Sequence, residues 1–265
     1  MVTRTDLPAA VEALGVQWIL LADSLATLTE ADRARPSVLP RWTVGDLGAH
    51  LVRVAGGMTG LPAAPAGTPP MTLSSYVARY APAAEEIAQD ARDRAGTFDG
   101  EQVVAAVRSA SAAQVAGFAA DSAVPGADRR VVSAPRGPLR FVDVVLTRLV
   151  EVVTHADDLA RSLDEPPGGL VDRAGLRIAC RALADALADR SPGHTVEVRV
   201  PPYAAVQCVP GPRHTRGTPP NVVETDPLTW LRLATGRTPW AEVVGTPALS
   251  ASGDRADLSG LLPLL

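Results

Sequence analysis

The chain has 265 residues, of which 46% are hydrophobic and 20% are charged, and its formal net charge is −4. This composition is typical of a globular protein that buries a sizeable core in one large domain or two ordinary ones. All 25 basic residues are arginines and none forms a long basic run, so nucleic-acid binding is not indicated. We attribute the arginine bias to a GC-rich, actinobacterial genome.

The compartment is predicted from the cysteines and from the apolar segments. Cys180 and Cys208 are far apart and form no metal-type pair, which predicts free thiols in a reducing compartment. The first residues include the charged Arg4 and Asp6 and no apolar core of the kind a signal peptide has, so we expect no signal peptide. No stretch approaches the roughly 18 uninterrupted apolar residues of a membrane span. We therefore expect a cytoplasmic protein with no membrane partner.

The first two thirds of the chain predicts a helical bundle. Apolar residues at helical spacing predict a first helix over about 6–30. Thr43, with Asp46 three residues later, predicts the capped start of a second helix that ends near residue 55. Residues 60–70 are rich in Pro, Ala and Gly and predict a loop. Three more helices are expected over about 73–95, 100–120 and 139–163, with an irregular segment over 121–138.

The last third has a different pattern. Glu165–Gly169 is the clearest break, and a helix is expected after it over about 171–189. Alternation of apolar and polar residues over 194–200 predicts a half-buried strand. Further elements are expected as strands at 204–209, 222–225 and 248–252, a short helix capped by Asp226, and an apolar helix or tail over 254–265. We therefore predict a mainly α domain over residues 1–165 and a small α+β domain over residues 166–265.

Two predicted helices carry the candidate functional residues. Glu151 and His155 are four residues apart, so they share one helix face, one turn apart. His50 lies on another helix, which a bundle can place opposite them. Two imidazoles and a carboxylate around an open position form the pattern of a catalytic zinc site. The spacing alone favours an exposed charge pair at Glu151 and His155, and His50 alone fits a hydrogen-bonded core histidine equally well.

Two further carboxylates are close to these histidines in the sequence. Asp158, one turn after His155, is a candidate to hold that ring in place by a hydrogen bond, and a solvated helix-end role is equally consistent with its position. Asp46, four residues before His50, is a second candidate for such support. Helix capping is the more common role for an aspartate at that position.

Four segments of the chain resemble one known family. Trp42–Leu51 and Glu151–Leu159 are similar to the two signatures of the mycothiol-dependent maleylpyruvate isomerase family. Glu224–Arg237 and Ser252–Leu258 are similar to the family's small sterol-carrier-like second domain. The resemblance spans nearly the whole chain. It implies a DinB-like four-helix metal-binding bundle followed by a sterol-carrier-like α+β domain.

The resemblance also implies a chemistry. In the family, the residues that correspond to His50, Glu151 and His155 bind zinc, and mycothiol is the thiol cofactor or co-substrate. A metal-stabilised thiolate then attacks an electrophilic small molecule. The outcome is either isomerisation of a maleylpyruvate-like substrate or S-transfer, in which the thioether is the product. A substrate-binding arginine is implied in the C-terminal domain, with Arg237 as the first candidate and Arg232 as the second. A solvated or ion-paired structural arginine is the alternative at both positions.

Two other function classes stay open. One is a metalloenzyme on the same scaffold that uses no thiol cofactor. The other is a non-enzymatic protein, either a small-molecule carrier or a metal sensor. A complete ligand triad favours an enzyme over a carrier, and a sensor would more naturally use cysteine ligands, which the motifs lack. The motifs are compatible with a monomer or a dimer.

Overall fold

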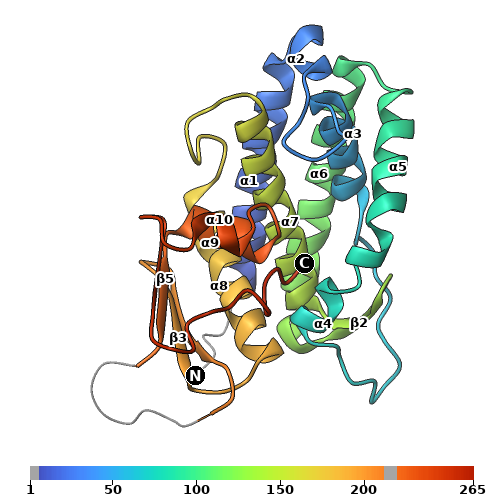
Figure 1. The fold of residues 1–265 in the computed structure, drawn as a ribbon. Coiled ribbons are helices and arrows are strands. Elements are labelled where there is room, and N and C mark those ends of the chain that lie inside the picture. The colour runs from blue at the N-terminus through green and yellow to red at the C-terminus, as the bar shows by residue number, and fades with distance from the viewer. Residues whose placement is uncertain (1–5, 212–219) are drawn as a thin grey trace. The chain divides into compact units, whose positions relative to one another are not determined.

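The computed structural model describes residues 6–211 and 220–265, and the chain divides into two compact units. The larger unit comprises Arg4–Met71 and Tyr80–Gly175, and the smaller comprises Thr72–Arg79 and Leu176–Leu265, within the described ranges. Figure 1 labels the elements of both units along the chain. The candidate metal ligands all belong to the larger unit.

Four long helices form the larger unit: α1 (Leu7–Thr27), α3 (Val44–Gly56), α6 (Gly100–Ser122) and α7 (Phe141–Ser162). Both α1 and α3 pack against α6 and α7, as the bundle in Figure 1 shows. The short helix α2 (Glu30–Ala34) precedes α3, and α5 (Ala84–Ala95) packs against α3. The buried hydrophobic side chains are mostly Leu, Val and Ala, and α7 is buried around most of its circumference. This is the predicted helical bundle.

The starts of these helices follow local capping signals. Thr43 Oγ1 accepts a hydrogen bond from the Asp46 amide, and the Asp46 carboxylate accepts one from the Thr43 amide. This reciprocal pair satisfies two amides at the start of α3 that have no partner within the helix. Asp99 and Gln102 form the same arrangement at the start of α6. The predicted capped start of the second long helix is therefore confirmed.

The stretch predicted as one helix over 73–95 is divided. It forms α4 (Leu73–Val77), the 3-10 turn η1 (Ala81–Ala83) and α5. Pro82 lies within η1, and a proline has no N–H to donate and its ring clashes with the preceding turn of an α-helix. A continuous helix is therefore disfavoured there, and the prediction of one helix is wrong.

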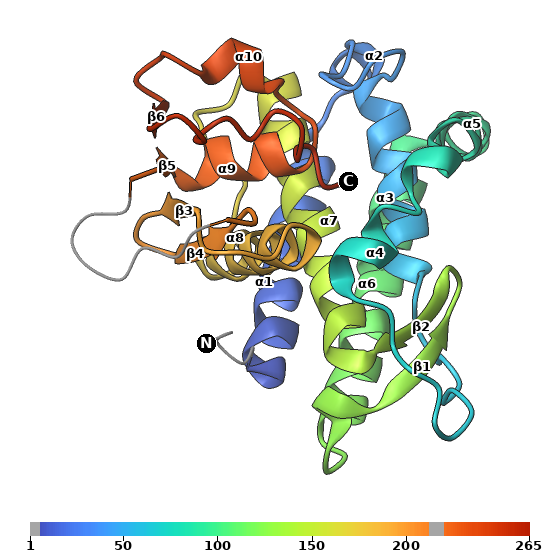
Figure 2. The same cartoon turned by 60° about the horizontal axis from the view of Figure 1, so that its bottom comes forward.

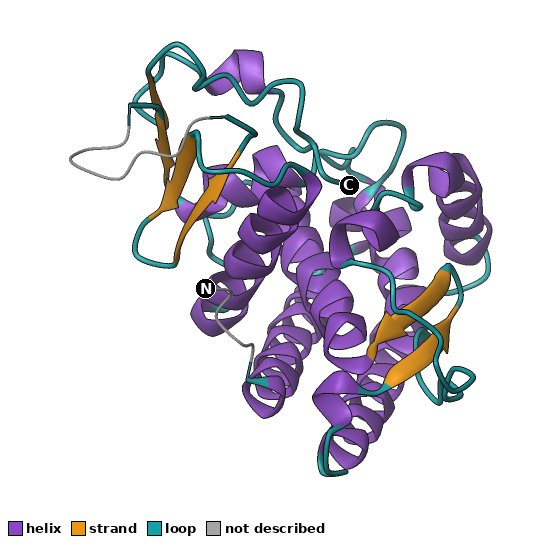
Figure 3. Ribbon diagram, turned by 90° about the horizontal axis from the view of Figure 1, so that it is seen from below, coloured by secondary structure: helices purple, strands orange, loops and turns teal. Residues whose placement is uncertain are grey.

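The segment 121–138 is more regular than predicted. It contains the 3-10 turn η2 (Ala127–Arg129) and β1 (Val131–Ala134). β1 pairs antiparallel with β2 (Gly137–Arg140), and Figure 3 shows this hairpin as a two-stranded ribbon. Pro135, Gly137 and Pro138 are signals for turns and loops, so the sequence of this segment does not indicate strands.

The smaller unit contains a four-stranded sheet in the order β4-β3-β5-β6. β3 (Val196–Val200) pairs antiparallel with β4 (Ala204–Cys208) and parallel with β5 (Val222–Thr225), which pairs antiparallel with β6 (Leu249–Ser252). Figure 2 shows these strands with α9 (Pro227–Ala234) and α10 (Trp240–Val243). The helix α8 (Arg173–Arg190) precedes them, and residues 254–265 form a tail without a helix. The unit is the predicted α+β arrangement.

Two helices, α1 and α6, are long and apolar enough to cross a membrane by length and composition alone. Each nevertheless contributes a large side chain, Trp18 and Phe118, to the buried core. Core helices of globular proteins commonly meet the same criterion, so the two helices are weak evidence for a membrane span.

Gln114 joins three helices of the bundle through a buried polar network. Trp18 Nε1 on α1 donates to Gln114 Oε1 over 3.0 Å. Gln114 Nε2 donates to the carbonyls of Val54 and Gly57 at the end of α3, over 3.0 and 2.8 Å. Gln114 therefore satisfies a buried indole N–H and adds a partner to two carbonyls at the end of α3, of which Val54 also accepts from the Gly57 amide.

Replacing Gln114 by alanine is expected to lower the free energy of unfolding by about 2–4 kcal/mol, because packing is lost and buried polar groups lose their partners. Denaturant unfolding followed by circular dichroism measures the change. The exposed Gln89→Ala on α5 is the matched control, with an expected change within about 0.5 kcal/mol. Equal stabilities of the two variants would contradict the structural role of Gln114.

Candidate metal centre

His50, Glu151 and His155 converge in the larger unit. One potential ligand atom from each side chain lies within 4.8 Å of the other two. α3 supplies His50, while α7 supplies Glu151 and His155 one turn apart on the face that packs against α3. Packing of α3 on α7 thus brings together residues that are about a hundred positions apart in the sequence.

The two histidines are almost fully buried. His50 is 4% exposed and His155 is 7% exposed. Their rings meet edge to face with centroids 4.9 Å apart, and the Trp42 ring lies 5.3 Å from the centroid of His50. Burial lowers the pKa of His50 below its ordinary value, although the neighbouring Glu151 opposes the change. His50 is therefore neutral at pH 7, which is the form that binds a metal.

Glu151 has a different partner for each of its oxygens. Oε1 lies 3.7 Å from His50 Nε2, and Oε2 lies 2.6 Å from Arg148 Nη1, one turn earlier on α7. Burial tends to raise the pKa of Glu151, but the charge of Arg148 and the contact with His50 outweigh it and lower that pKa to about 2. Glu151 is thus a carboxylate at neutral pH. Arg148 was not among the candidates predicted from the sequence, where its one signal is its spacing of three residues from Glu151.

Asp158 holds the ring of His155. Its Oδ2 lies 3.1 Å from His155 Nδ1, and the Asp158 side chain is fully buried. This contact leaves the other ring nitrogen, Nε2, to face a ligand. The ring of His50 has no such support, because its Nδ1 is buried without a hydrogen-bond partner among the described residues.

Asp46 has the contacts of a helix cap. Its Oδ2 accepts hydrogen bonds from the amide and the hydroxyl of Thr43, at 2.7 and 2.8 Å. Asp46 is not among the described side chains whose ligand atoms converge on His50. The structure therefore does not bring the second predicted support carboxylate to the ligand group.

The donor set fits a zinc ion. Two imidazole nitrogens and one carboxylate oxygen are ligands that zinc accepts, and three protein ligands leave a position for a further molecule. The contact between His155 and Asp158 is of the kind that orients ligating histidines.

The two candidate substrate-binding arginines belong to the smaller unit. Arg232 lies in the last turn of α9, and Arg237 follows Gly236, whose φ is 72°. Arg237 Nη1 donates to the Thr235 carbonyl over 3.0 Å. Their role in substrate binding stays a prediction.

Both cysteines are buried in the smaller unit. Burial raises the pKa of the Cys180 thiol to about 12 and that of the Cys208 thiol to about 11. Neither side chain therefore supplies a thiolate at neutral pH.

We expect both thiols to resist a thiol-specific disulfide reagent in the native protein and to react together once the chain is unfolded in denaturant. The absorbance of the coloured thiolate that the reagent releases at neutral pH follows the reaction. Fast modification of Cys180 or Cys208 under native conditions would contradict their burial.

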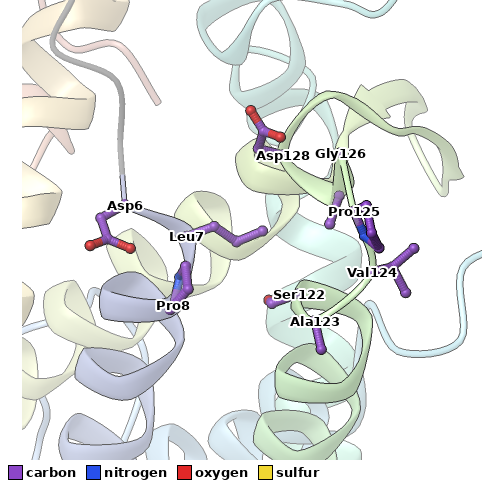
Figure 4. Close-up of a pocket in the computed structure, with 10 residues that line it drawn as sticks. Asp6, Leu7, Pro8, Ser122, Ala123, Val124, Pro125, Gly126 and Asp128 are labelled. Carbon is purple, nitrogen blue, oxygen red and sulfur yellow. The ribbon is translucent and has the colours of Figure 1, made fainter.

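A pocket of about 420 Å³ occurs elsewhere in the larger unit. Figure 4 shows it between the start of α1 and the end of α6, lined by residues 6–8 and 122–128. It shares no residue with the ligand group.

Comparison with known proteins assigns both parts of the chain. A family model described as the mycothiol maleylpyruvate isomerase N-terminal domain matches residues 14–160. A second model, described as a bacterial SCP ortholog, matches residues 172–264. The comparison with curated proteins found no significant match.

Solved structures are similar over nearly the whole chain. The crystal structure of a mycothiol-dependent maleylpyruvate isomerase has a TM-score of 0.57 and 16% identity, and the match covers 94% of this chain and 93% of that one. A crystal structure of the same kind of isomerase with one histidine mutated to alanine matches to the same extent.

These matches confirm the predicted fold class, which is a DinB-like helical bundle followed by a small sterol-carrier-like α+β domain. The domain boundary between residues 165 and 166 stays a prediction. The first family model alone spans more than half of the sequence. The chain therefore belongs to the mycothiol-dependent maleylpyruvate isomerase family of enzymes.

Proposed function

We propose that the chain is a zinc-dependent enzyme that uses the thiol of mycothiol to isomerise a maleylpyruvate-like small molecule. The observation that carries the proposal is the buried convergence of His50, Glu151 and His155 on one point. Family membership supports the thiol and the reaction class. The chain's own thiols are buried and protonated, which favours a thiol brought in from outside.

When bound, zinc and mycothiol would together supply a thiolate at neutral pH, and its reversible addition would permit rotation about a substrate double bond. The protein's own side chains prepare this chemistry. His50 and His155 offer ring nitrogens, and Glu151 offers one oxygen while Arg148 holds the other. Asp158 fixes the ring of His155.

We also propose that Arg237, with Arg232 as the second candidate, pairs with a carboxylate of the substrate. A planar guanidinium matches the geometry of a carboxylate, and the family resemblance supports an arginine from this domain. A cytoplasmic location and an actinobacterial source, both based on composition, belong to the same proposal.

Mass spectrometry of a turnover mixture tests the reaction. With zinc-loaded protein, mycothiol and maleylpyruvate, we expect chromatography ahead of the spectrometer to separate a product with the mass of the substrate, and we expect full return of the thiol. A stable thioether of mycothiol and the substrate would instead indicate S-transfer. Equal conversion without mycothiol would overturn the thiol-dependent mechanism and favour a metalloenzyme without a thiol cofactor.

Replacing Asp158 by asparagine is expected to weaken zinc binding about 10–100-fold, the usual effect of losing a partner that orients a ligating histidine. Competition with a chromophoric chelator measures the affinity. Asp143→Asn, in the first turn of the same helix, is the control and is expected to bind zinc as the wild type does. An unchanged affinity in Asp158→Asn would show that His155 needs no such partner.

A further inference from the structure

We propose that Arg148 is a positioning residue of this centre, which restricts Glu151 to one ligand oxygen and keeps the bound metal attractive to an anionic sulfur. The inference rests on the proposed function. It concerns a residue outside the ligand group, and its evidence is the set of contacts that Arg148 makes on α7.

Arg148 occupies one side of the Glu151 carboxylate. The arginine is 5% exposed, and its Nη1 lies 2.6 Å from Glu151 Oε2. The other oxygen, Oε1, is the one that faces His50. A hydrogen bond between two charged groups at this distance is among the strong ones, so Oε2 is engaged and Oε1 is left for a metal. Arg148 thereby favours coordination through one oxygen over coordination through both.

The guanidinium is itself held in place. Its Nη2 donates to the Tyr80 hydroxyl over 2.8 Å, and its Nε lies 3.5 Å from Thr147 Oγ1. The Tyr80 ring is in turn covered by the guanidinium of Arg136, 4.3 Å from the ring centroid. An arginine fixed by several partners loses little additional freedom when it holds Glu151. Its position is therefore well defined before any metal arrives.

The charge of Arg148 has opposite consequences for the metal and for the thiol. Glu151 is the one anionic residue of the ligand group, and Arg148 offsets its charge. With a divalent ion bound, the centre keeps a net positive charge at its open position. Arg148 thus repels the metal but attracts a thiolate, because like charges repel and opposite charges attract.

This opposition gives the experiment its readout. In Arg148→Met, we expect zinc affinity to be equal to or higher than that of the wild type. We expect mycothiol affinity of the zinc-loaded protein to fall about tenfold or more. The visible spectrum of the cobalt-loaded protein should also change, because a freed Glu151 oxygen raises the coordination number. Arg148→Lys keeps the charge and should recover part of the thiol affinity.

The controls separate this role from a merely structural one. Arg130→Met removes another arginine–carboxylate pair of the same unit, with Asp121, and should leave both affinities unchanged. Joint loss of zinc and thiol affinity in Arg148→Met would overturn the proposal. Wild-type thiol affinity with an unchanged cobalt spectrum would also overturn it.

A conservative variant covers the case in which Arg148→Met does not fold. Tyr80→Phe removes one hydroxyl that holds Arg148. It should leave zinc affinity equal or higher and lower mycothiol affinity, by less than Arg148→Met does. Unchanged affinities in a folded Tyr80→Phe would then overturn the proposal. Wild-type protein that binds no zinc, or binds zinc but no thiol, would instead refute the proposed function.

Discussion

Replacing His50 with alanine is expected to abolish stoichiometric zinc binding and, with it, catalysis. His50 is the single ligand that α3 contributes, so the variant retains two donors from α7 alone. We expect the affinity to fall by more than about 100-fold, beyond the loss that follows removal of an outer hydrogen-bond partner. Metal content per chain after dialysis, together with chelator competition, measures the effect.

A histidine outside the ligand group gives the matched control. His194 is exposed in the smaller unit and contacts Gln207 at 2.9 Å. His194→Ala should retain a full complement of zinc. Circular dichroism should show native helix content in both variants. A folded His50→Ala protein that keeps one tightly bound zinc would contradict the assignment of His50.

Replacing Glu151 with glutamine is expected to destabilise the metal-free protein as well as to weaken zinc binding. The substitution keeps the size of the side chain but leaves Arg148 buried without its carboxylate. Breaking a buried ion pair in this way costs about 3–5 kcal/mol, and we expect the lower end because Glu151 is 21% exposed. Denaturant unfolding in the presence of a chelator measures the loss without interference from the metal.

A double-mutant cycle isolates the pair. Adding Arg148→Met to Glu151→Gln removes the uncompensated charge, so the double variant should be more stable than the sum of the two single losses predicts. Glu85→Gln, in an exposed pair with Arg41, should change the free energy of unfolding by less than about 1 kcal/mol. Additive losses at Arg148 and Glu151 would contradict a coupled pair.

The long elements of this fold could be predicted from the sequence because their signals are local. The helices α1 and α7 have apolar residues at helical spacing, and Thr43 with Asp46 specifies the start of α3 by side-chain capping. The hairpin β1–β2 gives no comparable signal, because Pro135, Gly137 and Pro138 lie in or between its strands and favour a loop. At Pro82, periodicity predicts a longer helix than proline allows.

The site could be predicted in part for the same reason. A helix guarantees that Glu151 and His155 share a face, but the approach of His50 depends on how α3 packs against α7, which spacing does not encode. His50 became a candidate because a helical bundle can place it opposite the other two, and the family resemblance supported that choice. Arg148 was missed because an Arg and a Glu three residues apart usually form an exposed helix pair, and their burial becomes visible only in the folded bundle.

Titration of mycothiol into zinc-loaded and metal-free protein, followed by calorimetry, tests the central claim most directly. The claim is that the convergence of His50, Glu151 and His155 holds a metal that receives a thiol. We predict binding of one mycothiol per chain to the zinc-loaded protein and no binding to the metal-free protein. Equal binding to both forms, or no binding to a fully zinc-loaded protein, would contradict it.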